Sequence, residues 1–174
     1  MAVRIQEADF DVSAELAGLR AGRLDVGGLA SFLGTVRDLN QGDAVSAMEL
    51  EHYPGMTERA LEDIVAQAHA RWTLLDALVI HRVGKLAPGD QIVLVIVAAA
   101  HRGEAFAACE FIMDYLKTAA PFWKKESTPA GARLVDSRNS DNWAMEKWGL
   151  AGQGLGRAEE QRSEPARTRE DERR

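Results

Sequence analysis

The sequence predicts an α+β fold in which an antiparallel or mixed sheet packs against amphipathic helices. Two segments, Leu78 to Val83 and Gln91 to Val97, are rich in β-branched residues and are joined by a turn around Leu86-Ala87-Pro88-Gly89-Asp90. This pattern is typical of an antiparallel hairpin. Two longer segments place apolar residues at helical spacing. Hairpins beside amphipathic helices indicate segregated α and β layers rather than a doubly wound parallel sheet.

The N-terminal third is predicted to form a short helix and two strands. Asp11 or Ser13 can cap a helix that ends by Gly22, since both residue types accept hydrogen bonds from the first free backbone N–H groups. Gly27 to Val36 is predicted to be a strand. Val45 to His52 alternates apolar and polar residues, as half-buried strands do. The intervening residues, Arg37 to Asp43, are expected to form a polar loop.

The two long helices follow from their apolar spacing. Thr57 is predicted to cap the first, which extends to Trp72, after a turn from Tyr53 to Met56. The second runs from about Gly103 to Thr118, and Pro121 prevents its continuation. The rest of the domain is predicted to contain a loop, a short strand near residues 133–136 and a last helical turn near residues 141–148.

The composition bounds the domain and its partners. With 174 residues, 46% hydrophobic and 28% charged, the chain has the size and composition of one globular domain. We place that domain at residues 1–148, and a glycine-rich linker with a polar, disordered tail at 149–174, because the tail has little apolar surface to bury. The net charge of −6 lies wholly in the domain. This charge argues against nucleic-acid and membrane-surface partners.

The N-terminus and the apolar runs predict a cytoplasmic protein. The first residues reach Arg4 and Glu7 without a signal-peptide apolar core. The longest apolar run, Ile92 to Ala100, has 9 residues, too few to span a membrane. The single cysteine, Cys109, excludes an intrachain disulfide. Its position on the apolar face of the second helix favours packing over reactivity.

A local concentration of lysines stands out in this acidic chain. Lys117, Lys124 and Lys125 occur with no acidic residue between them, and Pro121-Phe122-Trp123 is interpreted as a rigid aromatic turn that separates the first two. Paired ammonium groups beside aromatic rings suit proton transfer or nucleophilic attack. The alternative for Lys117 is a helix C-terminal cation stabilised by the helix dipole.

A second candidate group consists of His101 and Arg102, which follow an apolar strand and open a helix. An imidazole and a guanidinium beside free helix N–H groups suit an anion such as phosphate. Arg37, at another strand end, is a third cation that could converge on the same crevice. Each also has a plain alternative as a solvated surface group. His52 and His81 lie in strand patterns and are interpreted as structural, and no spacing predicts a metal site.

Several segments resemble the catalytic (large) subunit of molybdopterin synthase. The resemblance covers roughly residues 4–148, with its motifs in the family's order, and the tail has no counterpart in it. The matching motifs are Gly34-Thr35-Val36-Arg37, Glu51-His52-Tyr53-Pro54-Gly55-Met56-Thr57, Ile80-His81-Arg82-Val83-Gly84, Pro88-Gly89-Asp90, Ala100-His101-Arg102, Phe111-Ile112-Met113-Asp114-Tyr115-Leu116-Lys117-Thr118 and Ala120-Pro121-Phe122-Trp123-Lys124-Lys125-Glu126.

The resemblance implies an α/β-hammerhead fold and a sulfurtransferase without a resident cofactor or metal. The implied reaction converts cyclic pyranopterin monophosphate into molybdopterin, with sulfur delivered as the C-terminal Gly-Gly thiocarboxylate of a small sulfur-carrier subunit. The implied assembly is a homodimer of this chain with a carrier at each end, a heterotetramer. By motif position, the implied catalytic residues are Lys117 and Lys124. The implied substrate-binding residues are Arg37, His101, Arg102, Lys125, Glu126 and, reaching across the dimer, Arg138.

Other functions compete with this one. A non-enzymatic module that binds a phosphorylated small molecule would need the arginines but not the paired lysines. A Schiff-base enzyme would use Lys117 as its nucleophile. A nucleic-acid-binding role is disfavoured by the charge of −6.

Overall fold

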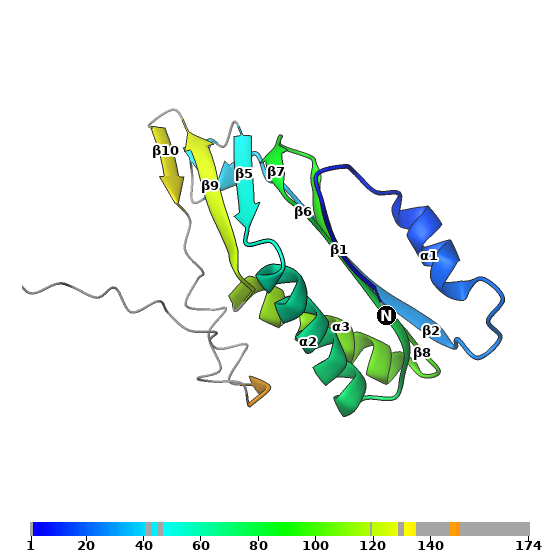
Figure 1. The fold of residues 1–174 in the computed structure, drawn as a ribbon. Coiled ribbons are helices and arrows are strands. Elements are labelled where there is room, and N and C mark those ends of the chain that lie inside the picture. The colour runs from blue at the N-terminus through cyan, green and yellow to red at the C-terminus, as the bar shows by residue number, and fades with distance from the viewer. Residues whose placement is uncertain are drawn as a thin grey trace, which may run out of the picture.

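A computed structural model describes most of the chain, with thirteen helices and strands among its described residues (Figure 1). The described residues are 2–40, 43–44, 47–118, 120–128, 131–134 and 147–149. The helices are α1 (Val12–Arg20), α2 (Met56–Arg71) and α3 (Arg102–Thr118). The strands are β1 (Ala2–Gln6), β2 (Gly28–Thr35), β3 (Leu39–Asn40), β4 (Asp43–Ala44), β5 (Ala47–His52), β6 (Leu74–Arg82), β7 (Gly84–Leu86), β8 (Gln91–Ala99), β9 (Phe122–Thr128) and β10 (Gly131–Leu134).

The larger sheet has the strand order β1-β6-β8-β2. β6 and β8 pair antiparallel, with Val79 opposite Val95, so the predicted hairpin is confirmed. β2 pairs antiparallel with the other side of β8. β1 runs parallel to β6 and was not predicted. A short edge strand is determined more by its neighbour than by its own propensity.

The second sheet has the order β10-β9-β5-β7. The sequence prediction of a loop here was wrong, because residues 122–128 form β9 and pair antiparallel with β5. The segment Phe-Trp-Lys-Lys-Glu-Ser-Thr lacks apolar alternation, so tertiary pairing determines its conformation. β7 precedes the predicted turn between β6 and β8, overlaps it only at Leu86, and joins this sheet. The predicted polar loop contains the short pair β3 and β4.

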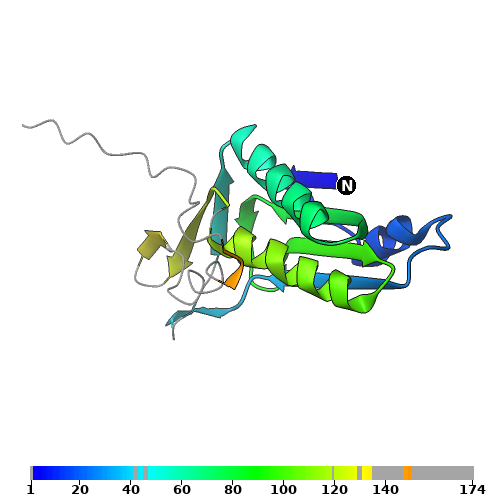
Figure 2. The same cartoon turned by 90° about the horizontal axis from the view of Figure 1, so that it is seen from below.

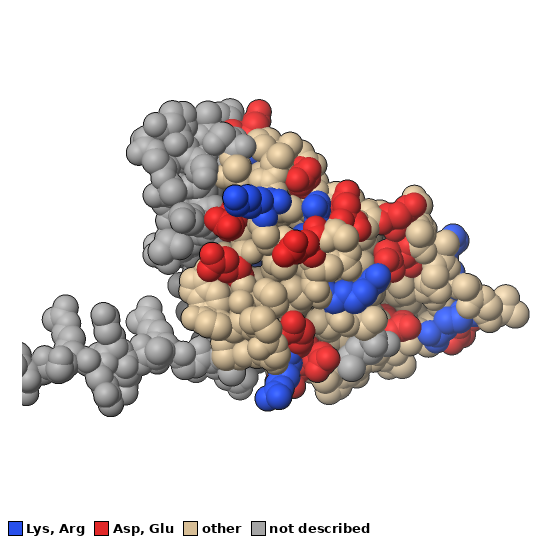
Figure 3. Space-filling view, turned by 45° about the horizontal axis from the view of Figure 1, so that its top comes forward, with Lys and Arg blue, Asp and Glu red and all other residues tan. Residues whose placement is uncertain are grey.

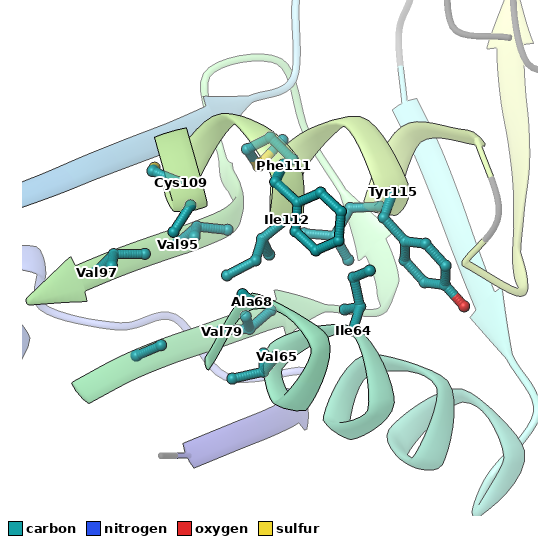
Figure 4. Close-up of a cluster of buried hydrophobic side chains, with 14 of the residues drawn as sticks. Ile64, Val65, Ala68, Val79, Val95, Val97, Cys109, Phe111, Ile112 and Tyr115 are labelled. Carbon is teal, nitrogen blue, oxygen red and sulfur yellow. The ribbon is translucent and has the colours of Figure 1, made fainter. Parts of the chain in front are cut away.

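The helices cover both faces of the larger sheet. α2 and α3 lie side by side on one face, and α1 lies on the other (Figures 1 and 2). Val79 and Val95 face α2 and α3, where Ile64 and Ile112 pack against them in a cluster with no exposed surface at these four residues (Figure 4). The intervening residues of β6 and β8 face α1, so both faces of the central strands are buried. This explains their nearly continuous apolar sequence.

The helix starts partly match the predictions. Asp11 caps α1 as expected, since its Oδ1 accepts from the backbone N–H groups of Ser13 and Ala14. The prediction that Thr57 caps α2 was wrong, because the helix begins at Met56, one residue after Gly55. Gly55 has φ +82°, a left-handed conformation that glycine adopts without strain.

The last described segment, residues 147–149, lies against α2 and α3. The indole Nε1 of Trp148 donates to Asp114 Oδ2 at 2.7 Å, and its ring contacts Trp72 and Phe111 edge-on. Most of the predicted helical turn at 141–148 lies outside the described residues. The predicted tail lies almost wholly outside them as well. The domain boundary therefore stays a prediction. None of the described helices is long and apolar enough to cross a membrane.

Candidate functional site

Lys117 lies in the last turn of α3 with its side chain exposed. Because α3 follows β8 directly and packs back along it, the end of α3 lies near the beginning of β8. Arg37 lies at the same end: Thr35, two residues earlier, pairs with Gln91, the first residue of β8. The exposed Arg37 lines a shallow hollow with Val36, Asp38, Pro88 and Gly89. The fold therefore places Lys117 and Arg37 at one end of the larger sheet.

The backbone of β9 brings three further predicted site residues to this end. Lys124, Lys125 and Glu126 occupy consecutive positions opposite Leu50, Glu49 and Met48 of β5, in that order. Leu50 and Met48 pack in a small core with Val36, the neighbour of Arg37. The end of α3 that carries Lys117 and the strand that carries Lys124 therefore both lie where the two sheets adjoin. The predicted aromatic turn between the lysines is only partly a turn, because β9 begins at Phe122.

His101 and Arg102 lie at the opposite end of α3 from Lys117. Both are exposed, at the junction between β8 and α3. The helix spans 17 residues, about 24 Å at the usual rise per residue. This length exceeds the combined reach of the Lys117 side chain and of either the His101 or the Arg102 side chain. The expected convergence of His101 and Arg102 with Arg37 therefore does not occur within one copy of the chain. Arg138 lies outside the described residues.

The histidines of the strands have structural environments, as the sequence suggested. His81 is buried, and its Nδ1 donates to the carbonyl oxygen of Arg82 at 2.8 Å. Burial lowers the pKa of His81 to about 4, so the ring is neutral at pH 7. His52 Nε2 lies 3.5 Å from Glu58 Oε1. No cluster of three metal-ligating side chains occurs among the described residues.

Cys109 is buried in the cluster beneath α3 (Figure 4). Burial raises the pKa of its thiol to about 11, so the thiol stays protonated near pH 7 and is a poor nucleophile. The buried position of Cys109 confirms the prediction that this side chain serves packing.

Two residues that no sequence pattern connects with this end of the molecule contact it in the fold. Thr57 and His81 contact the segment between Lys117 and Lys124: Thr57 Oγ1 donates to the Pro121 carbonyl, and the His81 ring stacks on Phe122. No sequence signal identifies these contacts, because they join residues at least 41 positions apart.

One face of the molecule shows how its charges are distributed. On the face shown in Figure 3, acidic and basic side chains are interspersed, and no broad basic area is present. On this face, an anionic ligand would therefore depend on a few local cations and not on a general basic surface.

Comparisons with known proteins give a consistent result. The family model described as "MoaE protein" matches residues 5–119. A curated protein of Ralstonia nicotianae, named molybdopterin synthase catalytic subunit, is 69% identical over 148 residues, which cover 85% of this chain and 84% of that protein. A protein of the same name from Pseudomonas aeruginosa is 53% identical over 148 residues, covering 85% of this chain and 99% of that protein.

Solved structures agree with the sequence relatives. A molybdopterin biosynthesis MoaE protein from Burkholderia ambifaria aligns with a TM-score of 0.74 at 61% identity, covering 86% of this chain and 99% of that one. The molybdopterin synthase structure from Staphylococcus aureus aligns with a TM-score of 0.70 at 26% identity, covering 76% and 95%. The α+β fold and the family resemblance inferred from the sequence are both confirmed. The chain belongs to the MoaE family, among whose curated members are molybdopterin synthase catalytic subunits.

Proposed function

We propose that this chain is the catalytic subunit of a molybdopterin synthase. It acts as a sulfurtransferase that converts cyclic pyranopterin monophosphate into molybdopterin by installing two dithiolene sulfurs. Each sulfur arrives as the C-terminal thiocarboxylate of a small carrier subunit. The observation that carries the proposal is the 69% identity to a protein named molybdopterin synthase catalytic subunit. That name favours an enzyme over the binding-module alternative.

The location of the cations supports an anion-binding role. The cyclic phosphate and the thiocarboxylate are both anions, so an acidic protein must concentrate its cations where they bind. Arg37 and Lys117 lie at one end of the larger sheet, and guanidinium groups bind phosphate through paired, charge-assisted hydrogen bonds. Lys125 and Glu126, on the same strand as Lys124, are proposed to line this pocket.

We infer that a complete pocket requires two copies of the chain. His101 and Arg102 lie about 24 Å along α3 from Lys117, so they cannot reach a phosphate held by Lys117 of their own copy. A homodimer would allow one copy to present His101 and Arg102 to the other copy's Lys117. Arg138 is proposed to cross the interface in the same way. With a carrier bound at each end, the assembly is a heterotetramer in the cytoplasm.

The two lysines are given separate roles. Lys117 is proposed to meet the carrier's terminal carbonyl and to transfer protons during release of sulfur from the carrier. Lys124 is proposed to stabilise the negative charge that develops during sulfur attack and opening of the phosphate ring. Because the sulfur arrives already activated on the carrier, no resident thiol, cofactor or metal is needed.

The first test is association with a carrier. Purified chain mixed with a small carrier ending in Gly-Gly should co-purify, and a cross-linker at the carrier's terminal glycine should join it to Lys117. Intact-mass analysis should show the added carrier mass in the wild type and not in Lys117→Ala. If the carrier is able to cross-link but the wild type gains no carrier mass, the placement of the carrier tail at Lys117 is wrong.

Cys109→Ser should retain most of the wild-type activity, because the buried thiol is not required to carry sulfur. A hydroxyl in this apolar site should cost about 1–3 kcal/mol of folding free energy. Product formation per folded molecule and urea unfolding measure the two effects separately. Cys109→Ala, which adds no polar group, is the matched variant. A folded but inactive Cys109→Ser protein would overturn the assignment of sulfur delivery to the carrier alone.

A further inference from the structure

The segment of residues 119–123, which includes the first two residues of β9, joins the two proposed catalytic lysines. Its described residues, Ala120 to Trp123, lie between the helix end that carries Lys117 and the strand position of Lys124. The Ala120 N–H donates to the Tyr115 carbonyl at 3.2 Å, which returns the chain toward the helix after its last turn. Any shift of this segment moves one lysine relative to the other.

Thr57 holds the segment through its hydroxyl group. This residue is completely buried in the first turn of α2. Its Oγ1 donates to the Pro121 carbonyl oxygen at 3.1 Å and accepts from the Tyr53 N–H at 3.1 Å. One hydroxyl therefore links the turn before α2 to the turn before β9. Loss of the hydroxyl would leave both backbone groups without this partner.

His81 holds the next residue by ring stacking. The imidazole lies parallel to the Phe122 ring, with centroids 3.8 Å apart and an interplanar angle of 17°. Its Nδ1–H bond to the Arg82 carbonyl fixes the ring on β6. Trp123, the following residue, contacts the Tyr53 ring edge-on, with the ring centroids 4.1 Å apart. Three consecutive residues are thus held from α2, from β6 and from the turn before α2.

We propose that Thr57 and His81 are positioning residues that set the spacing between Lys117 and Lys124. Neither is assigned a contact with the substrate; Thr57 holds the backbone at Pro121 and His81 holds the Phe122 ring, both between the lysines. The catalytic consequence rests on the proposed function, since it assumes that these lysines act on one substrate. Reactions that depend on two fixed groups lose rate steeply when the groups are displaced by about 1 Å.

The main experiment compares Thr57→Val with Thr57→Ser. Valine keeps the shape of threonine without its hydroxyl, whereas serine keeps the hydroxyl. We expect Thr57→Val to lower kcat at least about tenfold, with the KM for thiocarboxylated carrier unchanged within about twofold, and Thr57→Ser to stay within about threefold of wild type. Backbone amide exchange over residues 120–124 should accelerate about tenfold or more in Thr57→Val and not in Thr57→Ser.

A second pair of variants, at His81, tests the proposal if a Thr57 variant does not fold. His81→Leu removes the ring, whereas His81→Phe keeps a ring to stack on Phe122, and kcat should fall further in the leucine variant. Leu78→Ala is the control for general destabilisation of β6, because Leu78 packs on the other face of the strand from His81, in the cluster under α1. It should lower thermal stability while kcat per folded molecule stays within about twofold of wild type.

The outcomes separate the two proposals. If Thr57→Val or His81→Leu is folded and keeps wild-type kcat, the positioning role is wrong and the contacts serve only stability. If Leu78→Ala loses kcat as strongly as these variants, the same conclusion follows. If the wild type shows no turnover with thiocarboxylated carrier, the proposed function fails. The exchange comparison then still decides whether Thr57 fixes the segment, and equal rates in its two variants would refute that.

Discussion

Lys117→Ala is expected to lower product formation by about 10²- to 10⁴-fold, the usual contribution of a positioned proton-transfer group. The side chain is exposed in the last turn of α3, so its truncation removes a functional group without opening a core cavity. Folding free energy should change by no more than about 0.5 kcal/mol. The measurement is single-turnover formation of molybdopterin from cyclic pyranopterin monophosphate and thiocarboxylated carrier.

Lys85→Ala is the matched control for the loss of one exposed lysine. Lys85 lies on β7, at the opposite edge of the second sheet from the β9–β10 pair. It changes the net charge by the same amount and should retain wild-type turnover. Wild-type turnover in Lys117→Ala would remove this lysine from the mechanism. An equal loss in both variants would indicate that net charge, rather than position, governs the rate.

Substitutions at Lys124 are expected to separate charge from proton transfer. Lys124→Ala should lower turnover by about 10²- to 10³-fold, as the loss of one electrostatic contact to a developing charge typically does. Lys124→Arg retains the positive charge but is a poor proton donor or acceptor near pH 7, because guanidinium stays protonated. It should therefore recover a substantial part of the rate.

The strand position makes the alanine variant interpretable. Lys124 pairs with Leu50 through the backbone, so the β5–β9 ladder does not depend on its side chain. Circular dichroism and urea unfolding should match wild type within about 0.5 kcal/mol. Equal inactivity of the alanine and arginine variants, with folding intact, would contradict a purely electrostatic role and favour proton transfer at Lys124.

The elements that carry their own periodicity could be predicted from the sequence. β6 and β8 are rich in β-branched residues, and α2 and α3 repeat apolar residues every three or four positions, so local pattern and tertiary environment agree. β9 could not be predicted, because its polar residues become a strand only by pairing with β5. β1 was missed for a similar reason, since β6 supplies its pairing.

Residue type and position singled out the candidate site residues but did not predict their arrangement. Lys117 and Arg37 were found from residue type and position at element ends, and the fold places them at one end of the larger sheet. The distance between Lys117 and the His101–Arg102 pair follows from the length of α3, which was itself predicted. The contacts of Thr57 and His81 with Pro121 and Phe122 depend on tertiary packing.

The late position of β9 in the chain has a consequence for the kinetics of folding. β9 pairs with β5 across seventy to eighty residues, from His52 with Phe122 to Ala47 with Ser127. The larger sheet and its covering helices need only residues up to Thr118. Ordering long-range pairs costs loop-closure entropy and slows folding. During synthesis the larger sheet and its helices can therefore form first, and the end that carries the two proposed catalytic lysines is completed only when β9 has emerged.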